Sequence, residues 1–296
     1  LGRNLASSSV LTVGSNTSLT NINLSSLSLS FEPFKNFNLR FDGNFKTLRS
    51  ASDDFSLDYY SNPERTETQA KTEQLEISTI AQFSPGRKTS GYGVERITVN
   101  EGRYPEFLVN YTKGVDQITT SDFDYEKIQL YYRQPIQVGG FGKFVSTLEV
   151  GKTFGEVPLS LLSIVPGNQT LFSIQGTFPL LDFYDFVTDT YASVNFEHNF
   201  NGRFFSRISF LRDLDLREIV SVRAVSGSIS DQNQLLNAST TNSILIAPDQ
   251  EPYWSYSFGL GNIFRVLRID FHFRGNYKEM TGARTFGVTG GFGFSF

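Results

Sequence analysis

Residues 267–274 read LRIDFHFR and alternate between large apolar and charged side chains. Along a β-strand, successive side chains point to opposite faces. One face of this strand would carry Leu267, Ile269, Phe271 and Phe273. The other would carry Arg268, Asp270, His272 and Arg274. Charged groups are costly in a dry core and large apolar groups need burial, so this strand requires a polar environment on one side only.

The same two-residue period recurs through the chain. It is found in SLSLSF (residues 26–31), FNLRFD (37–42), EKIQLYYRQ (126–134), EIVSVRAV (218–225) and YWSYSFGLG (253–261). In these segments the polar face includes Arg40, Arg133 and Arg223. The final stretch, RTFGVTGGFGFSF (284–296), places Phe292, Phe294 and Phe296 on one face and Gly, Thr and Ser on the other.

Two architectures could hold so many two-faced strands. A soluble β-sandwich buries one face of each sheet, but it leaves much apolar surface uncovered when no helices pack on the strands. A closed barrel in lipid satisfies every strand, because apolar side chains face lipid, charged side chains face a polar lumen and no edge stays unpaired. We therefore predict an all-β fold, a transmembrane antiparallel β-barrel of about 12–14 strands, with residues 1–296 as a single domain.

The alternation also predicts which charged side chains face the lumen. They are Arg40, Arg133, Arg223, Arg268, Asp270, His272 and Arg274. A barrel of this size can be open or filled by its own side chains and loops. The mixed signs of these charges favour pairing inside the barrel, and hence a plugged or narrow interior.

Composition excludes several classes of protein. The 26 basic and 30 acidic residues nearly balance, which gives no reason to expect a nucleic-acid partner. Cysteine is absent, so disulfides and thiolate metal sites are excluded. No stretch approaches the roughly 18 consecutive apolar residues of a membrane-spanning helix. The start, LGRNLASSSV, lacks the basic and apolar regions of a signal peptide, so we interpret the chain as a mature or trimmed form.

The middle of the chain resembles one family of outer-membrane proteins. The segments concerned are YPEFLVNYTKGV (104–115), residues 121–170, residues 183–233 and the strand pair YWSYSFGLGNIFRVLRIDFHFR (253–274). Members of this family join a carboxypeptidase-like regulatory domain to a C-terminal barrel, and the resemblance covers roughly residues 104–296. It implies a barrel fold and a chain that is the C-terminal part of a longer precursor. It implies no peptidase activity, since the name of the regulatory domain refers to a carrier domain.

More distantly, the last strands are similar to those of BamA-type barrels, which insert or secrete proteins. The last strand of such barrels also ends on an aromatic residue, which the barrel-assembly machinery recognises. That resemblance implies a C-terminal assembly signal in Phe292, Phe294 and Phe296. BamA-type barrels carry a Val-Arg-Gly-Tyr loop motif, for which the nearest segments here are FRGN (273–276) and VRAV (222–225). The resemblance therefore implies a shared fold and leaves insertase activity open.

Three groups of residues could indicate chemistry, and each has a plainer interpretation. Asp182, Asp185 and Asp189 could bind Ca²⁺, but a polar surface loop explains them more simply. LRDLDLRE (211–218) could organise a charged lumen, but a solvated ion-pair network explains it as well. His272 and Asp270 could form an acid–base pair, but no nucleophile motif accompanies them. We expect no catalytic residue, no metal and no cofactor.

These observations favour a non-enzymatic protein of the Gram-negative outer membrane. We expect a role in envelope transport, protein export or outer-membrane assembly, within a complex. The expected partners are outer-membrane lipids and lipopolysaccharide, the barrel-assembly machinery during biogenesis, and periplasmic proteins or lipoproteins. The alternative is a passive, porin-like channel for small solutes, in which the lumen charges set ion preference. A barrel-embedded enzyme is the third and least favoured hypothesis.

Overall fold

The computed structural model of the chain describes residues 18–53, 55–91, 97–99, 101–116, 120–237 and 245–292. Within these residues, eleven strands form one large sheet, and each pair of neighbours is antiparallel. The sheet follows the chain order, as a meander. The prediction of an all-β, antiparallel fold is confirmed.

The strands of the sheet, in spatial order, are β1 (Thr20–Phe34), β2 (Phe37–Ser50), β5 (Lys71–Phe83), β8 (Glu106–Val115), β9 (Tyr125–Gln137), β10 (Lys143–Phe154), β13 (Thr190–Asn199), β14 (Arg217–Ser228), β15 (Tyr253–Ile263), β16 (Leu267–Arg274) and β17 (Phe286–Phe292). Three two-stranded pairs lie outside it: β3 (Tyr59–Tyr60) with β4 (Thr68–Gln69), β6 (Thr89–Ser90) with β7 (Ile97–Thr98), and β11 (Ser163–Ile164) with β12 (Val187–Thr188). The α-helices are short: α1 (Ser209–Arg212) and α2 (Asp231–Leu236).

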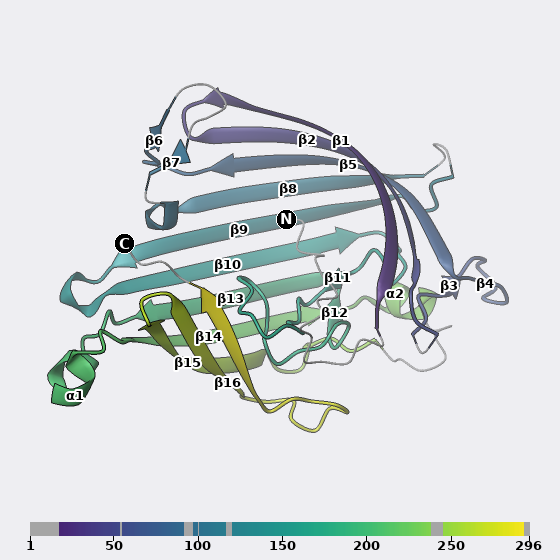
Figure 1. Cartoon of the computed structure of the whole chain (residues 1–296). Helices are drawn as coiled ribbons and strands as arrows, with labels where there is room; N and C mark the ends of the chain where they lie inside the picture. The colour runs from purple at the N-terminus through teal and green to yellow at the C-terminus, as the bar shows by residue number, and fades with distance from the viewer. Residues whose placement is uncertain are drawn as a thin grey trace.

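The sheet curls strongly without closing in the described residues. Its two edges are β1 and β17, which do not pair with each other. Figure 1 shows the curled sheet, with the segment that carries β11 and β12 on its concave side. Among the described residues, no helix is long and apolar enough to cross a membrane. We refer to the concave side of the sheet as the interior.

The eleven strands that the described residues form differ in number from the expected 12–14, and this number has a geometric consequence. In an antiparallel meander each strand reverses the direction of the one before it. The first and the eleventh strand therefore run in the same direction, so β1 and β17 could meet only as a parallel pair. Bacterial single-chain barrels have even strand numbers, which avoids such a parallel seam.

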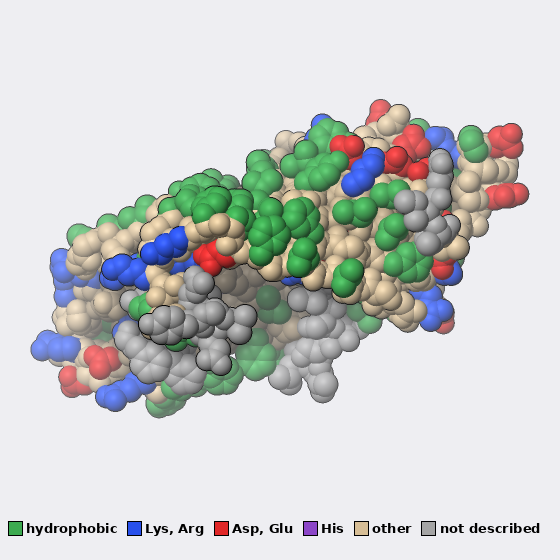
Figure 2. Space-filling view, turned by 90° about the horizontal axis from the view of Figure 1, so that it is seen from above, with side chains coloured by type: hydrophobic (Ala, Val, Ile, Leu, Met, Phe, Trp, Pro, Cys, Tyr) green, Lys and Arg blue, Asp and Glu red, His purple; other side chains and the backbone are tan. Residues whose placement is uncertain are grey.

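The distribution of side chains is inverted relative to a soluble protein. Except for β16, whose apolar side chains are half-buried, each strand of the large sheet carries at least one exposed apolar side chain on its outer face. They include Leu27, Phe41, Ile77, Val109, Leu130, Val150, Phe196, Val222, Trp254, Phe258 and Phe292. Figure 2 shows apolar side chains spread over the strands, with charged side chains mostly toward the two ends. A soluble monomer rarely exposes so large an apolar surface.

The interior is polar where it meets the sheet and apolar where the chain folds back into it. Strand side chains that are at least nine-tenths buried include Gln74, Glu76, Thr112, Ser221, Arg223, Ser257, Asp270 and Thr289. Two apolar clusters lie among them. The first centres on Val157, Leu159 and Leu161, and the second on Val165, Leu181 and Phe186. Both clusters are built on the connection between β10 and β13.

Candidate functional site

The connection between β10 and β13, residues 155–189, fills part of the interior, and we call it the inner segment. Its regular structure consists of β11 and β12, which pair at its base, where Val165 N–H also donates to Phe186 O at 2.9 Å. Val157, Leu181 and Phe186 in this segment have no exposed surface. The apolar side chains of the two clusters, among them Leu159, Val165 and Phe178, are thus buried inside the sheet, whereas Leu171 and Phe172 remain exposed.

Three arginines from the sheet and its last loop bind the backbone of the inner segment. Arg223 Nη1 on β14 donates to Thr177 O at 3.1 Å, and Arg274 Nη1 on β16 donates to Leu180 O at 3.2 Å. Arg284, just before β17, donates to Leu181 O at 3.1 Å and to the Asp182 carboxylate at 2.9 Å. A buried carbonyl is costly to leave without a donor, so these contacts fix the inner segment in one position.

Two asparagines of the β14–β15 connection hold the start of the inner segment. Asn233 Oδ1 accepts the N–H of Val157 at 2.9 Å, and Asn237 Oδ1 accepts that of Leu159 at 2.6 Å. Asn237 Nδ2 also donates to Val157 O at 3.2 Å. These amides pair with backbone groups as a neighbouring strand would, which satisfies buried groups that have no sheet partner.

Asp189 locks the end of the inner segment to the same connection. Its carboxylate accepts hydrogen bonds from Ser230 N–H at 2.6 Å and Asn233 Nδ2 at 3.0 Å, while Thr190 Oγ1 donates to it at 3.1 Å. Burial by itself raises the pKa of this carboxyl, but the hydrogen bonds outweigh burial and hold the pKa below its ordinary value. The ionised form is therefore the one that the fold stabilises.

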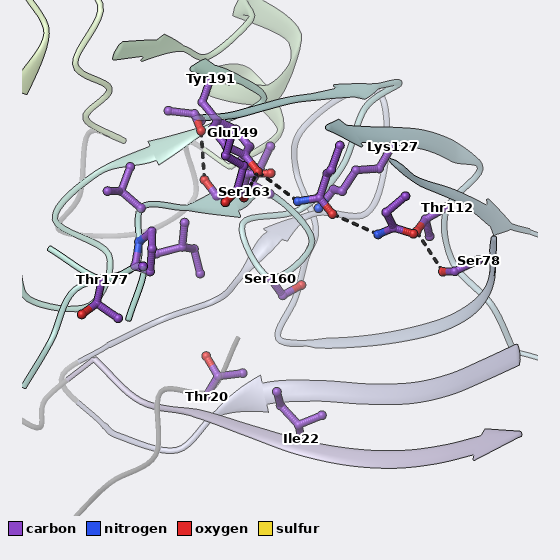
Figure 3. A pocket seen from close by; sticks show the side chains of 18 of the residues that line it. Thr20, Ile22, Ser78, Thr112, Lys127, Glu149, Ser160, Ser163, Thr177 and Tyr191 are labelled. Atoms are coloured by element: carbon purple, nitrogen blue, oxygen red, sulfur yellow. Dashed lines mark hydrogen bonds between the residues drawn. The ribbon is translucent and has the colours of Figure 1, made fainter. Parts of the chain in front are cut away.

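Beside the inner segment lies a cavity of about 1110 Å³, bounded on its other side by β1, β2, β5, β8, β9 and β10. A row of hydrogen-bonding side chains crosses its wall, as Figure 3 shows. Ser78 pairs with Thr112 at 2.8 Å, Asn110 Nδ2 donates to Gln129 at 3.1 Å, and Gln129 Nε2 donates to Tyr191 OH at 3.0 Å. Tyr191 OH in turn donates to Glu149 at 2.8 Å.

The charged side chains of the cavity are compensated locally. Arg40 pairs with Asp42 at 2.7 Å, and Lys46 pairs with Glu76 at 2.5 Å. Lys127 Nζ donates to Leu161 O of the inner segment at 2.9 Å. The polar part of the cavity wall therefore presents mostly neutral hydroxyl and amide groups, which can both donate and accept hydrogen bonds. Apolar side chains such as Ile80, Leu108 and Val165 form the rest of the wall.

Further interior charges lie on β13, β14 and β16. Arg268 bridges Glu197 and the buried Asp270, each at 2.7 Å. Arg223 Nε donates to Asn195 Oδ1 at 3.3 Å. Arg133 is half-buried on the same strand face as Lys127 and Gln129. The opposite charges lie close enough to neutralise one another.

The residues with a possible chemical role have structural partners. His272 Nε2 lies 2.8 Å from Thr289 Oγ1, whereas Asp270 is bound by Arg268, so the acid–base pair weighed from the sequence is not formed in these contacts. Asp182 pairs with Arg284, and Asp185 Oδ2 accepts the N–H of Asp182 at 2.9 Å. Within the described residues, no three His, Asp or Glu side chains gather as metal ligands.

The C-terminal aromatic residues are only partly described. Phe292 ends β17 on the outer face and is 70% exposed. Phe294 and Phe296 lie outside the described residues. Alternation does not identify the anchoring residues Arg284, Asn233 and Asn237, because they lie in connections. The two asparagines have one sequence signal, their four-residue spacing in NQLLN (233–237).

Comparison with known proteins places the chain in a family and a fold. One family model matches residues 9–234, and its description is "Family of unknown function (DUF5686) C-terminal domain". No curated protein matches the chain. Among solved structures, the chain is similar to BamA from Haemophilus ducreyi lacking POTRA domains 1–3, with a TM-score of 0.54 and 13% identity. The match covers 92% of this chain and 54% of that one, so the chain spans about half of that BamA chain.

Proposed function

The chain belongs to the DUF5686 family, because residues 9–234 match the C-terminal domain of that family. From that premise we propose that it is an integral outer-membrane protein whose interior is normally filled. The outer face of its sheet would contact lipid, as in the BamA barrel to which it is similar in fold. The observation that carries the proposal is the inner segment, whose backbone accepts hydrogen bonds from three arginines.

The role that fits this arrangement is non-enzymatic. A filled interior disfavours steady passage of solutes, and it suits a protein that acts in envelope transport, protein export or outer-membrane assembly with periplasmic or lipoprotein partners. Its lipid environment would be the phospholipid and lipopolysaccharide of the outer membrane. The finer resemblance, to the family with a carboxypeptidase-like regulatory domain, stays a prediction.

The second candidate function is a passive channel for small solutes. It is favoured by the cavity of about 1110 Å³ beside the inner segment, because the hydroxyl and amide groups on part of its wall can form hydrogen bonds with water and polar solutes that pass through. The two functions differ in one measurable property. A filled barrel carries little current, while a channel carries a steady one.

The experiment purifies the protein from native outer membranes in mild detergent and records it in planar bilayers. We expect co-purifying periplasmic proteins or lipoproteins and little conductance from the intact chain. A variant in which residues 166–185 are replaced by Gly-Ser-Gly should conduct steadily, because Val165 and Phe186 are already hydrogen-bonded neighbours and the short turn can close the gap. The matched control shortens the exposed turn at residues 62–66.

Steady current from the intact chain, purified without partners, would make it a porin-like channel and contradict the proposal. If the intact chain, the 166–185 replacement and the variant with the shortened 62–66 turn all carry no current, the claim that the inner segment blocks the interior is wrong. The folded state of each variant is checked by its electrophoretic mobility without heating.

A further inference from the structure

Part of the inner segment binds the edge of β17 that does not pair with β16. Gly290 N–H donates to Leu171 O, and Gly290 O accepts the N–H of Ser173, both at 2.7 Å. Phe172 and Gly290 thereby form a parallel bridge. Both backbone hydrogen-bonding groups of Gly290 are used, so no second strand can bind at this position at the same time.

The segment Leu171–Ser173, which we call the edge cap, has a defined shape. Asn168 is buried, its Nδ2 donates to Phe172 O at 2.8 Å, and its Oδ1 accepts the N–H of Thr170 at 2.9 Å. The Phe172 ring lies 6.0 Å from the ring of Phe292, centroid to centroid. Because Gly290 and Phe292 share the outer face of β17, the edge cap also extends the apolar outer face.

The direction of the edge cap matches that of β1. The cap pairs with β17 in parallel, and β1 also runs in the direction of β17 because the sheet has eleven antiparallel strands. In the described sheet β1 pairs with β2 alone, and its outward Leu27 and Leu29 are 81% and 63% exposed. An unpaired strand edge is not tolerated within the hydrocarbon of a membrane, so an edge in lipid must find a partner.

We propose that the edge cap and β1 are alternative partners of the same backbone groups on β17. While the cap is bound, β1 cannot close the sheet. When the cap leaves, β1 can take its place as a parallel strand. The cap belongs to the inner segment, so closing the sheet and moving the inner segment are one event. This inference rests on the proposed function, in which the sheet lies in a membrane and the inner segment fills it.

Engineered cysteine pairs test the proposal directly, because the natural chain contains no cysteine. One pair, F172C with G290C, reports the bound cap. Two other pairs, L27C with G290C and L29C with G290C, report β1 on the same edge. A side chain at position 290 is accommodated, since its nearest neighbours would lie at 3.8 Å and 3.9 Å. V109C with G290C serves as the background pair.

The state in which β1 pairs with β17 is favoured by removing one hydrogen bond between the edge cap and β17. Ser173→Pro deletes the N–H that Gly290 accepts, and Ser173→Ala keeps it. In proteoliposomes under mild oxidation, we expect F172C/G290C to cross-link in the otherwise unchanged chain. Adding Ser173→Pro should lower that yield and raise the L27C/G290C or L29C/G290C yield about fivefold, the factor that one backbone hydrogen bond is worth. Ser173→Ala should change neither.

Two outcomes overturn the proposal. One is a β1 pair that cross-links in the unchanged chain while F172C/G290C does not. The other is a Ser173→Pro variant that loses the cap cross-link without gaining either β1 cross-link. Both can occur in a protein that is electrically silent and releases current when residues 166–185 are replaced, so the inference can fail while the proposed function stands. Unheated electrophoresis confirms that each variant is folded.

Discussion

At the scale of single residues, the buried arginines show how a polar face can organise the chain that packs on it. Arg274 is 2% exposed, and its guanidinium lies 5.1 Å from the Tyr253 ring centre while donating to Leu180 O. A guanidinium offers five N–H donors in a fixed plane. It can therefore serve an aromatic ring and a backbone carbonyl at once, which a lysine cannot do with the same geometry.

The carboxyl of Asp189 predicts how the stability of the fold depends on pH. Its pKa is held below the ordinary value of about 3.9, so the ionised form contributes stability at neutral pH. That contribution is complete above the pKa of the unfolded chain and is lost as pH falls through the lower pKa of the folded chain. We expect wild-type protein to lose more unfolding free energy between pH 7 and pH 3 than the Asp189→Asn variant.

The measurement for Asp189 is urea unfolding in detergent micelles at both pH values. The control is Asp53→Asn, in the β2–β3 connection, for which we expect the wild-type pH dependence. Equal losses in wild type and Asp189→Asn would show that the carboxylate does not stabilise the fold by being ionised. The loss from this one carboxyl by pH 3 is at most about 1.2 kcal/mol, because pH 3 lies only about 0.9 pH units below the pKa of about 3.9 in the unfolded chain.

Alternation indicates which side of a strand a residue occupies. In LRIDFHFR the alternation separates the two faces, and the structure places Asp270, His272 and Arg274 in the interior with at most 3% exposure. It cannot predict their partners. Arg268 pairs with Glu197, which is 71 residues away, and the register of β13, β14, β15 and β16 brings them together.

At the scale of elements, alternation does not predict that the inner segment folds into the interior of the sheet. VPLSLLSIV (157–165) has the composition of a membrane strand, yet only Ser163–Ile164 is a strand in it. The segment is buried because Asn233, Asn237 and Lys127 supply hydrogen bonds to its backbone from distant parts of the chain. A pattern of apolar residues does not show whether lipid or protein covers them.

The asparagine contacts predict a local effect. Replacing Asn237 by alanine leaves the buried N–H of Leu159 and the carbonyl of Val157 without this partner. We expect the amides of Val157 and Leu159 to exchange hydrogen about tenfold faster, since an unsatisfied buried group costs about 1–3 kcal/mol. Hydrogen exchange with mass spectrometry over residues 155–165 measures this.

The control for this exchange experiment is Asn21→Ala, at an exposed position on β1. We expect it to leave exchange in the inner segment unchanged. If Asn237→Ala exchanges at the wild-type rate over residues 155–165, the asparagine does not hold the segment. If exchange accelerates equally across β14 and β15, the variant loosens the sheet, and the local account is wrong.

At the scale of the whole molecule, the main feature is the inverted distribution of side chains. The outer face exposes apolar side chains such as Leu27, Val109 and Phe258, whose contact with water is unfavourable. The polar side chains of Gln74 and Asp270, by contrast, are almost fully buried. The fold class can be predicted from the sequence because the alternation that causes this inversion recurs in strand after strand. The number of strands cannot be predicted, because it depends on which connections fold inward and which segment pairs with the edge of β17.

The central claim is that the outer face contacts lipid, and the single tryptophan tests it most directly. Trp254 lies on the outer face of β15 and is 41% exposed. In proteoliposomes, we expect brominated lipids to quench its fluorescence and aqueous acrylamide to have little effect. A variant that combines Trp254→Phe with Phe258→Trp moves the probe along the same face and should behave alike. Efficient quenching by acrylamide, with none by brominated lipid, would contradict the claim.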